Sequence, residues 1–170
     1  YGINSHAEGT QSFAYGYSSH AEGRNTTASG NSSHAEGNGT TASGDMSHAE
    51  GFQTTASGAN SHAEGSNVDS ANKVLPDRTV TISDVEYTRS GPYAYGINSH
   101  AEGTQTFAYG YSSHAEGYQT TAIGSYSHAE GHNTTSYVYS HAEGYNTTAS
   151  GSYSHAEGYN TTASGSYSHA

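Results

Sequence analysis

Residues 154–167 read Ser154-His-Ala-Glu-Gly-Tyr-Asn-Thr-Thr-Ala-Ser-Gly-Ser-Tyr167, and this 14-residue unit recurs along the chain. Its pentapeptide Ser-His-Ala-Glu-Gly occurs in full ten times, and an eleventh copy begins at Ser168. The first serines of the complete copies are Ser5, Ser19, Ser33, Ser47, Ser61, Ser99, Ser113, Ser127, Ser140 and Ser154. The steps between copies are 14 residues, except for one of 13 and one of 38. So strict a period is the signature of a repeat architecture.

Each unit contains two half-units of the form Ser/Thr-x-Ala-x-Gly-x-x, which start at Ser154 and Thr161 in the example above. Alternating residues followed by a glycine predict two short β-strands and two tight turns per unit. A glycine every seven residues, beside pairs of β-branched threonines, disfavours a helix. The sequence therefore predicts an all-β fold, a parallel β-roll (β-solenoid) with one coil per 14 residues and equivalent residues about 4.8 Å apart.

The composition excludes several classes of protein. Only ten residues are Ile, Leu or Val, so an ordinary globular enzyme with an aliphatic core is excluded. No apolar run approaches the roughly 20 residues of a membrane-spanning helix, and we expect no membrane insertion. The net charge of −11, with four Lys and Arg residues, argues against a nucleic-acid partner.

Comparison of the copies predicts which side chains point inward. In the second half-unit the first, third and fifth positions stay small, as in Thr26, Ala28 and Gly30, whereas the second and fourth positions vary. Because residues alternate between the two faces of a strand, the small set is predicted to fill a tightly packed interior. The variable set is predicted to point outward. Our candidates for surface recognition are Phe13, Tyr15, Phe107 and Tyr109 from this set, together with Arg78 and Arg89.

The same alternation places the His and Glu of every pentapeptide outward on one face, and this pair is unchanged in all complete copies. An Ala-lined interior buries little apolar area, so we predict that the His–Glu face meets a second copy of the chain. Recent duplication of the repeat is the alternative explanation of the invariance. The predicted oligomer interface, named the His–Glu ladder here, comprises His6, Glu8, His20, Glu22, His34, Glu36, His48, Glu50, His62, Glu64, His100, Glu102, His114, Glu116, His128, Glu130, His141, Glu143, His155 and Glu157.

The ladder invites two chemical interpretations. Ser19 and His20 are adjacent and point to opposite faces, so the hydroxyl cannot reach its own imidazole as a catalytic triad requires. We therefore expect no enzymatic activity and no cofactor. An ion-pair or hydrogen-bond ladder is the simpler interpretation of stacked His and Glu, and no metal site is assigned. Residues that would offer nitrogen and oxygen ligands to zinc-like ions are His6, Glu8, His20, Glu22, His34 and Glu36.

The step of 38 residues implies an insertion of 24 residues, which we place at 68–91 between the roll segments 1–67 and 92–170. This insertion holds six of the ten Ile, Leu and Val residues. Residues 78–87 alternate like a strand after a Pro-Asp turn signal. We predict a protruding loop or hairpin that is either a binding element or a spacer. Because the eleventh copy is incomplete, we expect the roll to continue beyond residue 170.

One further column is expected at a corner of each coil. Gln or Asn precedes the Thr pair in nearly every copy, as in Gln53, Asn67, Gln105 and Gln119. Stacked side-chain amides form hydrogen bonds along a cross-β stack, so these residues are predicted to form an amide ladder.

The 14-residue period and its Ser/Thr-x-Ala-x-Gly half-units resemble the head repeats of YadA-like trimeric autotransporter adhesins. The Ser-His-Ala-Glu-Gly form resembles repeats in bacteriophage tail fibres and related bacterial surface proteins. The resemblance, which covers all but about residues 68–91, implies a left-handed roll, a homotrimer, and a location on a bacterial cell surface or a phage virion. The adhesin repeat usually has aliphatic residues where this chain has His and Glu, as at His100 and Glu102, so a polar subunit interface is expected.

These observations favour a structural or adhesive fibre segment, the rigid shaft or head of an extracellular appendage. Its partners would be copies of itself and a host-surface glycan or protein. The alternative is a purely structural filament or spacer with no ligand. An ice-binding solenoid is a further alternative, because Thr27, Thr41 and Thr55 are expected to form one exposed threonine column.

Overall fold

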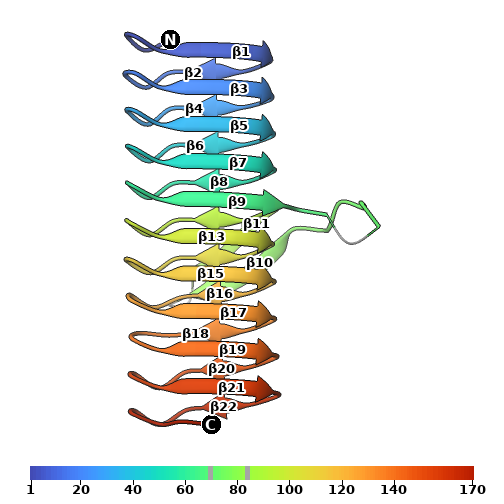
Figure 1. Ribbon diagram of the computed structural model, residues 1–170, viewed down its shortest axis with the longest axis vertical. Helices are drawn as coiled ribbons and strands as arrows, with labels where there is room; N and C mark the ends of the chain where they lie inside the picture. The colour runs from blue at the N-terminus through green and yellow to red at the C-terminus, as the bar shows by residue number, and fades with distance from the viewer. Residues whose placement is uncertain (69–70, 83–84) are drawn as a thin grey trace.

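The computed structural model describes residues 1–68, 71–82 and 85–170, apart from the side chain of Val85. The chain winds into a stack of coils, each with one five-residue strand and one two-residue strand (Figure 1). In Figure 1 the long strands cross the front toward the right and the short strands return behind them as the chain descends, so the coils are left-handed. No helix occurs in the described ranges, and hence none that could cross a membrane.

The long strands form one parallel ten-stranded sheet. They are β1 (His6–Thr10), β3 (His20–Arg24), β5 (His34–Asn38), β7 (His48–Phe52), β9 (His62–Ser66), β13 (His100–Thr104), β15 (His114–Tyr118), β17 (His128–His132), β19 (His141–Tyr145) and β21 (His155–Tyr159). The register places each residue beside its equivalent in the next coil, with His6 opposite His20 and Glu8 opposite Glu22. Identical side chains therefore stack in columns along the roll.

The short strands form a second parallel ten-stranded sheet on the other side of the coil. They are β2 (Phe13–Ala14), β4 (Thr27–Ala28), β6 (Thr41–Ala42), β8 (Thr55–Ala56), β12 (Tyr93–Ala94), β14 (Phe107–Ala108), β16 (Thr121–Ala122), β18 (Thr135–Ser136), β20 (Thr148–Ala149) and β22 (Thr162–Ala163). The predicted β-roll is confirmed, but the two strands of a coil are unequal. The second half-unit is short because the chain already turns after Ala14, where Tyr15 N and Gly16 N both donate to Ala28 O.

Small side chains fill the space between the sheets, as the alternation predicted. The buried alanines of both sheets form two clusters, from Ala14 to Ala129 and from Ala142 to Ala163. Ser136 occupies the alanine position in β18 and so interrupts the alanine column of the short-strand sheet. The serine of the pentapeptide is also buried, and its hydroxyl closes the preceding corner: Ser33 Oγ donates to Gly30 O at 2.7 Å. The equivalent bond recurs in most coils, for example from Ser47 and Ser113, and gives the serine a structural role there.

The corners bring successive coils too close together for most side chains. Gly23, near the end of β3, has a φ of +113°, which residues with a Cβ rarely adopt. Gly30, at the other corner, has an ordinary φ, but a Cβ built on it would lie 2.0 Å from Gly44 O in the next coil. A Cβ on Gly23 would also lie 2.2 Å from Gly37 O, so glycine is required for close approach at both corners and for its conformation at the first.

The predicted amide ladder is present at the corner after the long strand. Asn67 Nδ2 donates to Gln53 Oε1 at 2.9 Å, Gln105 Nε2 donates to Asn67 Oδ1 at 3.1 Å, and Gln119 Nε2 donates to Gln105 Oε1 at 2.9 Å. The ladder thus crosses the position where the insertion leaves the roll, just after Asn67. Asn67 and Gln105 are each 1% exposed, so the bonds satisfy amides that water cannot reach.

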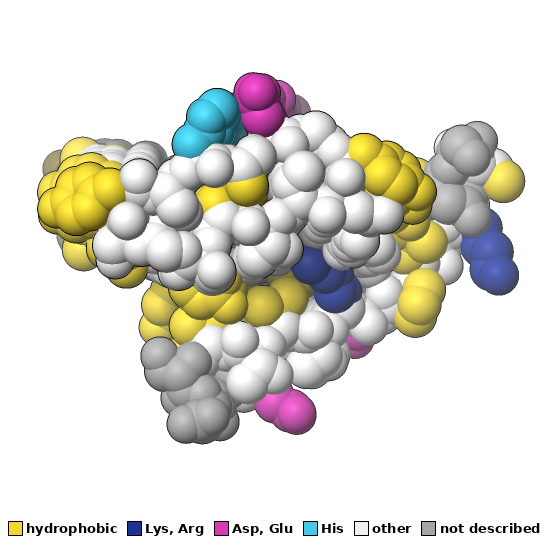
Figure 2. Space-filling model, turned by 90° about the horizontal axis from the view of Figure 1, so that it is seen from below, with side chains coloured by type: hydrophobic (Ala, Val, Ile, Leu, Met, Phe, Trp, Pro, Cys, Tyr) yellow, Lys and Arg dark blue, Asp and Glu magenta, His cyan; other side chains and the backbone are white. Residues whose placement is uncertain are grey.

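The insertion forms an antiparallel hairpin of β10 (Arg78–Ile82) and β11 (Val85–Arg89). Around it the roll continues without a break, because β8 pairs with β12 and β9 pairs with β13. The hairpin lies against the outer face of the short-strand sheet, on the side of the roll opposite the His–Glu ladder (Figure 2). A hydrophobic layer fills the space between hairpin and roll, where Val80, Ile82 and Tyr87 pack on Tyr93, Phe107 and Tyr109.

Candidate functional site

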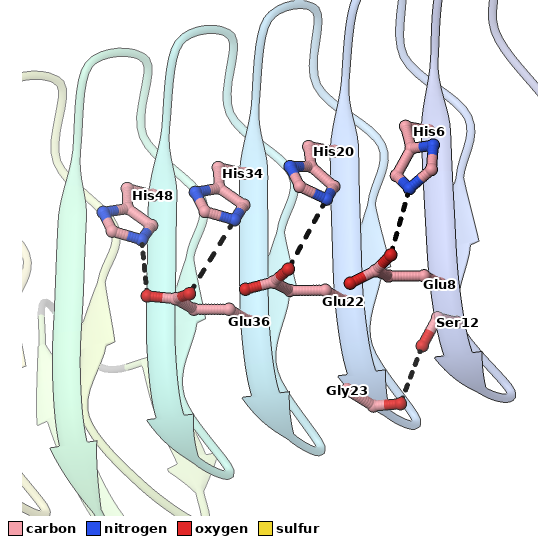
Figure 3. Close-up of polar contacts among 9 residues, drawn as sticks. All are labelled: His6, Glu8, Ser12, His20, Glu22, Gly23, His34, Glu36 and His48. Atoms are coloured by element: carbon pink, nitrogen blue, oxygen red, sulfur yellow. Dashed lines mark hydrogen bonds and ion pairs between the residues drawn. The ribbon is translucent and has the colours of Figure 1, made fainter.

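The His–Glu ladder occupies the outer face of the long-strand sheet. Each pentapeptide contributes one His and one Glu, two residues apart in a strand, so both project to the same side while the alanine between them points inward (Figure 3). From His20 onward the imidazole rings stack nearly parallel, with centroids 4.8 Å apart between His34 and His48. All residues predicted for the oligomer interface lie on this face.

Close contacts between imidazole nitrogens and carboxylate oxygens connect the two columns both within a coil and between coils. Glu36 lies between two imidazoles, with Oε2 4.0 Å from His34 Nε2 and Oε1 3.6 Å from His48 Nε2 (Figure 3). Between His62 and Glu64 the corresponding distance is 3.7 Å. These N···O separations exceed ordinary hydrogen-bond length, so the contacts are electrostatic. The side chains are about one third exposed through most of the ladder, for example 35% for His114 and 33% for Glu116.

The carboxylates also line a groove that runs along the roll. Its open volume is about 730 Å³, and its walls include Glu22, Glu36 and Glu50 with the glycines that follow them in the strands. Two carboxylates one strand spacing apart repel by about 1 kcal/mol in water and about 3.5 kcal/mol at an effective dielectric constant of 20. A row of such charges favours any arrangement that brings cations to this face.

Burial weakens the basicity of two imidazoles in the column, those of His114 and His141. Burial, together with smaller effects of the neighbouring imidazoles of His100 and His128, lowers the pKa of His114 to about 4. Glu102 and Glu130 raise it, but by less. The close carboxylates therefore do not suffice to charge the His114 ring at neutral pH. At this point of the ladder a neutral imidazole lies beside the carboxylates.

We expect acidification to destabilise the roll between about pH 6.5 and pH 4. The pKa of His141 is lowered for the same reasons as that of His114. An unfolded chain therefore binds protons in this interval that the folded chain does not, and stability falls as pH falls. Thermal unfolding in metal-free buffer, followed by circular dichroism, should give a lower Tm at pH 4.5 than at pH 7.5.

Two variants make this measurement specific. His114→Gln removes a ladder imidazole and should reduce the fall in Tm, whereas His132→Gln, outside the ladder, should leave it unchanged. A Tm that is constant or rises on acidification would show that the carboxylates raise the histidine pKa values by more than burial lowers them.

The hairpin corrects the predictions for the opposite face. Phe107 and Tyr109 were predicted to point outward for recognition, but they are 0% and 8% exposed because the hairpin covers them. Arg78, also predicted as a recognition residue, packs over the Phe107 ring at 5.1 Å and donates from Nη1 to Gln105 O and Thr120 O. Its burial lowers its pKa to about 10. These three residues attach the hairpin to the roll and are not free for recognition.

The other predicted recognition residues are accessible. Phe13 is 39% exposed and Tyr15 53% exposed. Arg89 is partly exposed and packs over the ring of Tyr93 at 4.6 Å. Its Nη2 donates a hydrogen bond to the Tyr93 hydroxyl oxygen at 3.4 Å, and this bond raises the pKa of Arg89. The threonine column that would bind ice includes Thr27, Thr41 and Thr55. It is interrupted by Phe13 and by the hairpin, so it does not form a flat surface.

Two aromatic columns follow the corners of the C-terminal coils. In one, Tyr118, His132 and Tyr145 stack 4.8 and 4.7 Å apart. In the other, Tyr139 and Tyr153 stack at 4.8 Å. His132 and Tyr139 belong to these columns and were not among the site residues predicted from the sequence. The repeat register contains the signal, since both occupy positions equivalent to the tyrosines.

Sequence reasoning also missed the partners of the hairpin. Tyr87 lies 4.9 Å from Tyr109, and Tyr93 lies 6.0 Å from Tyr109, between ring centroids. Tyr93 stands in the same column as Thr55 and Phe107. The alternation pattern gives no signal that this part of the column is covered.

The fold and its repeated outer face define a parallel β-solenoid with one dominant polar ladder. The family model described as the YadA head domain repeat matches residues 2–19, 21–45, 49–68, 115–136 and 142–168. These segments make up well over half of the chain, which therefore belongs to the YadA head domain repeat family. The predicted resemblance is confirmed, and membership implies an adhesin-type, surface-exposed protein. A comparison with curated proteins found no match.

Proposed function

We propose that this chain is a rigid segment of a surface fibre that assembles as a homotrimer and attaches the fibre to a host surface. The observation that carries the proposal is the unbroken register of the long-strand sheet, in which every pentapeptide stacks on its equivalent. A stack of this kind has no internal hinge at the insertion, since β9 pairs directly with β13. It suits a load-bearing shaft or head.

The His–Glu ladder is the face proposed to meet the other subunits. It keeps the same two side chains in every complete coil, whereas the opposite face carries Phe13, Thr27 and the hairpin. Symmetric assembly favours a regular surface that can complement itself. An alanine interior also leaves the single roll with little apolar burial, which further supports assembly.

The assembly is tested by light scattering coupled to size exclusion, which should give about three times the chain mass of 17.6 kDa. Glu102→Lys with Glu116→Lys should shift the protein toward the monomer, while Thr27→Lys on the opposite sheet should not. A monomeric wild-type chain would contradict the trimer. A trimer that survives both ladder substitutions would place the interface elsewhere.

We propose attachment, with no enzymatic activity, through the accessible side chains of the other face. Phe13 and Tyr15 are exposed aromatic residues of the kind that is enriched in binding surfaces. Immobilised glycans and host-surface proteins should retain the wild-type chain and retain less of a Phe13→Ser/Tyr15→Ser variant. Retention of neither protein would favour the second candidate, a structural filament without a ligand. That candidate is supported by the hairpin, whose apolar side chains face the roll.

A further inference from the structure

The ladder contains a repeated cluster of potential metal ligands. In each cluster two imidazole nitrogens from successive coils and one carboxylate oxygen between them all lie within 4.8 Å of one another. His100, Glu102 and His114 form one such group. The next group along the roll shares His114, so the clusters are continuous.

In the described coils from His20 to His155, the imidazole nitrogens that face the carboxylates form no hydrogen bond, although carboxylate oxygens lie near them. Among the described residues, nine ladder Nε2 atoms are shielded from solvent and have no hydrogen-bond partner. They belong to His20, His34, His48, His62, His100, His114, His128, His141 and His155. A polar atom in this state normally has a partner in the working molecule. The same unpaired nitrogen recurs in coil after coil, which indicates a property of the repeat.

The distances fit a cation between the two columns. His100 Nε2 and Glu102 Oε2 are 3.5 Å apart, and His114 Nε2 and Glu116 Oε2 are 3.6 Å apart. Two ligands of a four-coordinate zinc ion, each about 2.0–2.1 Å from the metal, lie about 3.3–3.4 Å from each other. The pairs are too far apart for a hydrogen bond but need to move little to share an ion.

The surroundings allow an ion to enter. In the single chain the groove beside the carboxylates is open from Glu8 to Gly103, and its glycines, such as Gly23 and Gly37, place no side chain in the way. The carboxylates of Glu22 and Glu36 lie on its wall and attract cations from solution.

We propose that the His–Glu ladder binds divalent transition-metal ions of the Zn²⁺ type. Each ion is held by the Nε2 atom of one His and by carboxylate oxygens of one or two Glu, with water completing the coordination. Mixed nitrogen and oxygen ligands favour Zn²⁺, Ni²⁺ or Cu²⁺ over Mg²⁺ and Ca²⁺, which prefer oxygen alone. The inference does not depend on the proposed attachment function.

Charge sets the expected number of ions. The ladder holds ten glutamates, and one divalent ion neutralises two of them, which gives about five ions per chain. Occupation of every second coil also keeps neighbouring ions about 9.6 Å apart, twice the strand spacing. Glu36, which lies between His34 and His48, illustrates how one carboxylate can serve either of two neighbouring positions.

The test is calorimetric titration of the purified, assembled protein with ZnCl₂ at pH 7.5, and separately with MgCl₂. We expect binding of about five Zn²⁺ per chain and no comparable binding of Mg²⁺. A variant with four consecutive ladder substitutions should lose about two of these ions. Its substitutions are His100→Gln, His114→Gln, His128→Gln and His141→Gln. His132→Gln, which removes a histidine outside the ladder, should lose none.

Each opposing outcome overturns the proposal. Absence of Zn²⁺ binding, equal binding of Mg²⁺, or full binding by the four-histidine variant would exclude histidine ligands in the ladder. An equal loss of bound Zn²⁺ in His132→Gln would mean that the metal binds to individual histidines and not to the ladder. If the four-histidine variant fails to fold, the visible spectrum of the wild-type chain loaded with Co²⁺ is the test. Four-coordinate nitrogen and oxygen ligands give strong visible absorption. The weak spectrum of the hydrated ion would contradict the proposal.

Discussion

Gly30→Ala is expected to lower the free energy of unfolding by about 3 kcal/mol, at the upper end of the usual range for overpacking. The new Cβ would lie 2.0 Å from Gly44 O and 2.4 Å from Gly44 C. Both atoms belong to the backbone of the next coil, so no flexible side chain can move aside. The coils must separate locally, and urea unfolding followed by circular dichroism should show the loss.

Gly165 provides a matched control in the 170-residue chain, because it ends the same Thr-Thr-Ala-Ser-Gly segment as Gly30. A Cβ on Gly165 would meet Ser168 Cβ at an ordinary distance of 3.6 Å. Gly165→Ala should therefore change stability by less than about 0.5 kcal/mol, as is usual for surface substitutions. Equal losses in the two variants would mean that glycine is required for the turn itself and would contradict the close-approach explanation.

The repeat made most of the fold predictable from sequence. In a roll whose period equals the repeat, each residue stacks on its own equivalent, so the pattern within one unit also determines its neighbours. Inward alanine and serine and outward His and Glu followed from alternation alone. The amide ladder of Asn67 and Gln105 followed from the same register.

The unequal strands and the electrostatics of the ladder were beyond this reasoning. The half-units have similar sequences. In the first half the strand continues from His6 to Thr10, whereas in the second half the chain turns after Ala14. Which charge state His114 adopts depends on the balance between burial, like-charged neighbours and carboxylates. That balance requires distances, which a sequence pattern does not supply.

The hairpin is the clearest case of a tertiary contact that overrides a local pattern. Residues 10–23 and 104–117 are identical except that Ser12 corresponds to Thr106. Alternation therefore assigns Phe13 and Phe107 the same outward position, and both do project from the same side of the short-strand sheet. Only Phe107 is covered, because the hairpin returns to the sheet at that coil.

Phe107→Ala is expected to cost about 3–4 kcal/mol, the usual loss when a buried phenylalanine is truncated. The ring is 0% exposed, packs within the aromatic layer under the hairpin, and supports the Arg78 guanidinium. Its removal leaves a cavity beneath β10 and β11 and loosens the partly buried cation above it. Phe13→Ala should cost less than about 1 kcal/mol, because Phe13 is already 39% exposed and only part of its area is removed from water.

Hydrogen exchange shows which part of the chain each substitution destabilises, and by how much. In Phe107→Ala the amides of β10 and β11 should lose protection first, because the hairpin has its own antiparallel pairing but depends on the roll for its apolar packing. In Phe13→Ala their protection should equal that of the wild-type chain. Equal destabilisation by the two substitutions, or unchanged protection of the hairpin in Phe107→Ala, would mean that the hairpin is held without this layer. In that case Phe107 and Phe13, which occupy equivalent positions in the repeat, would also contribute equally to the free energy of unfolding.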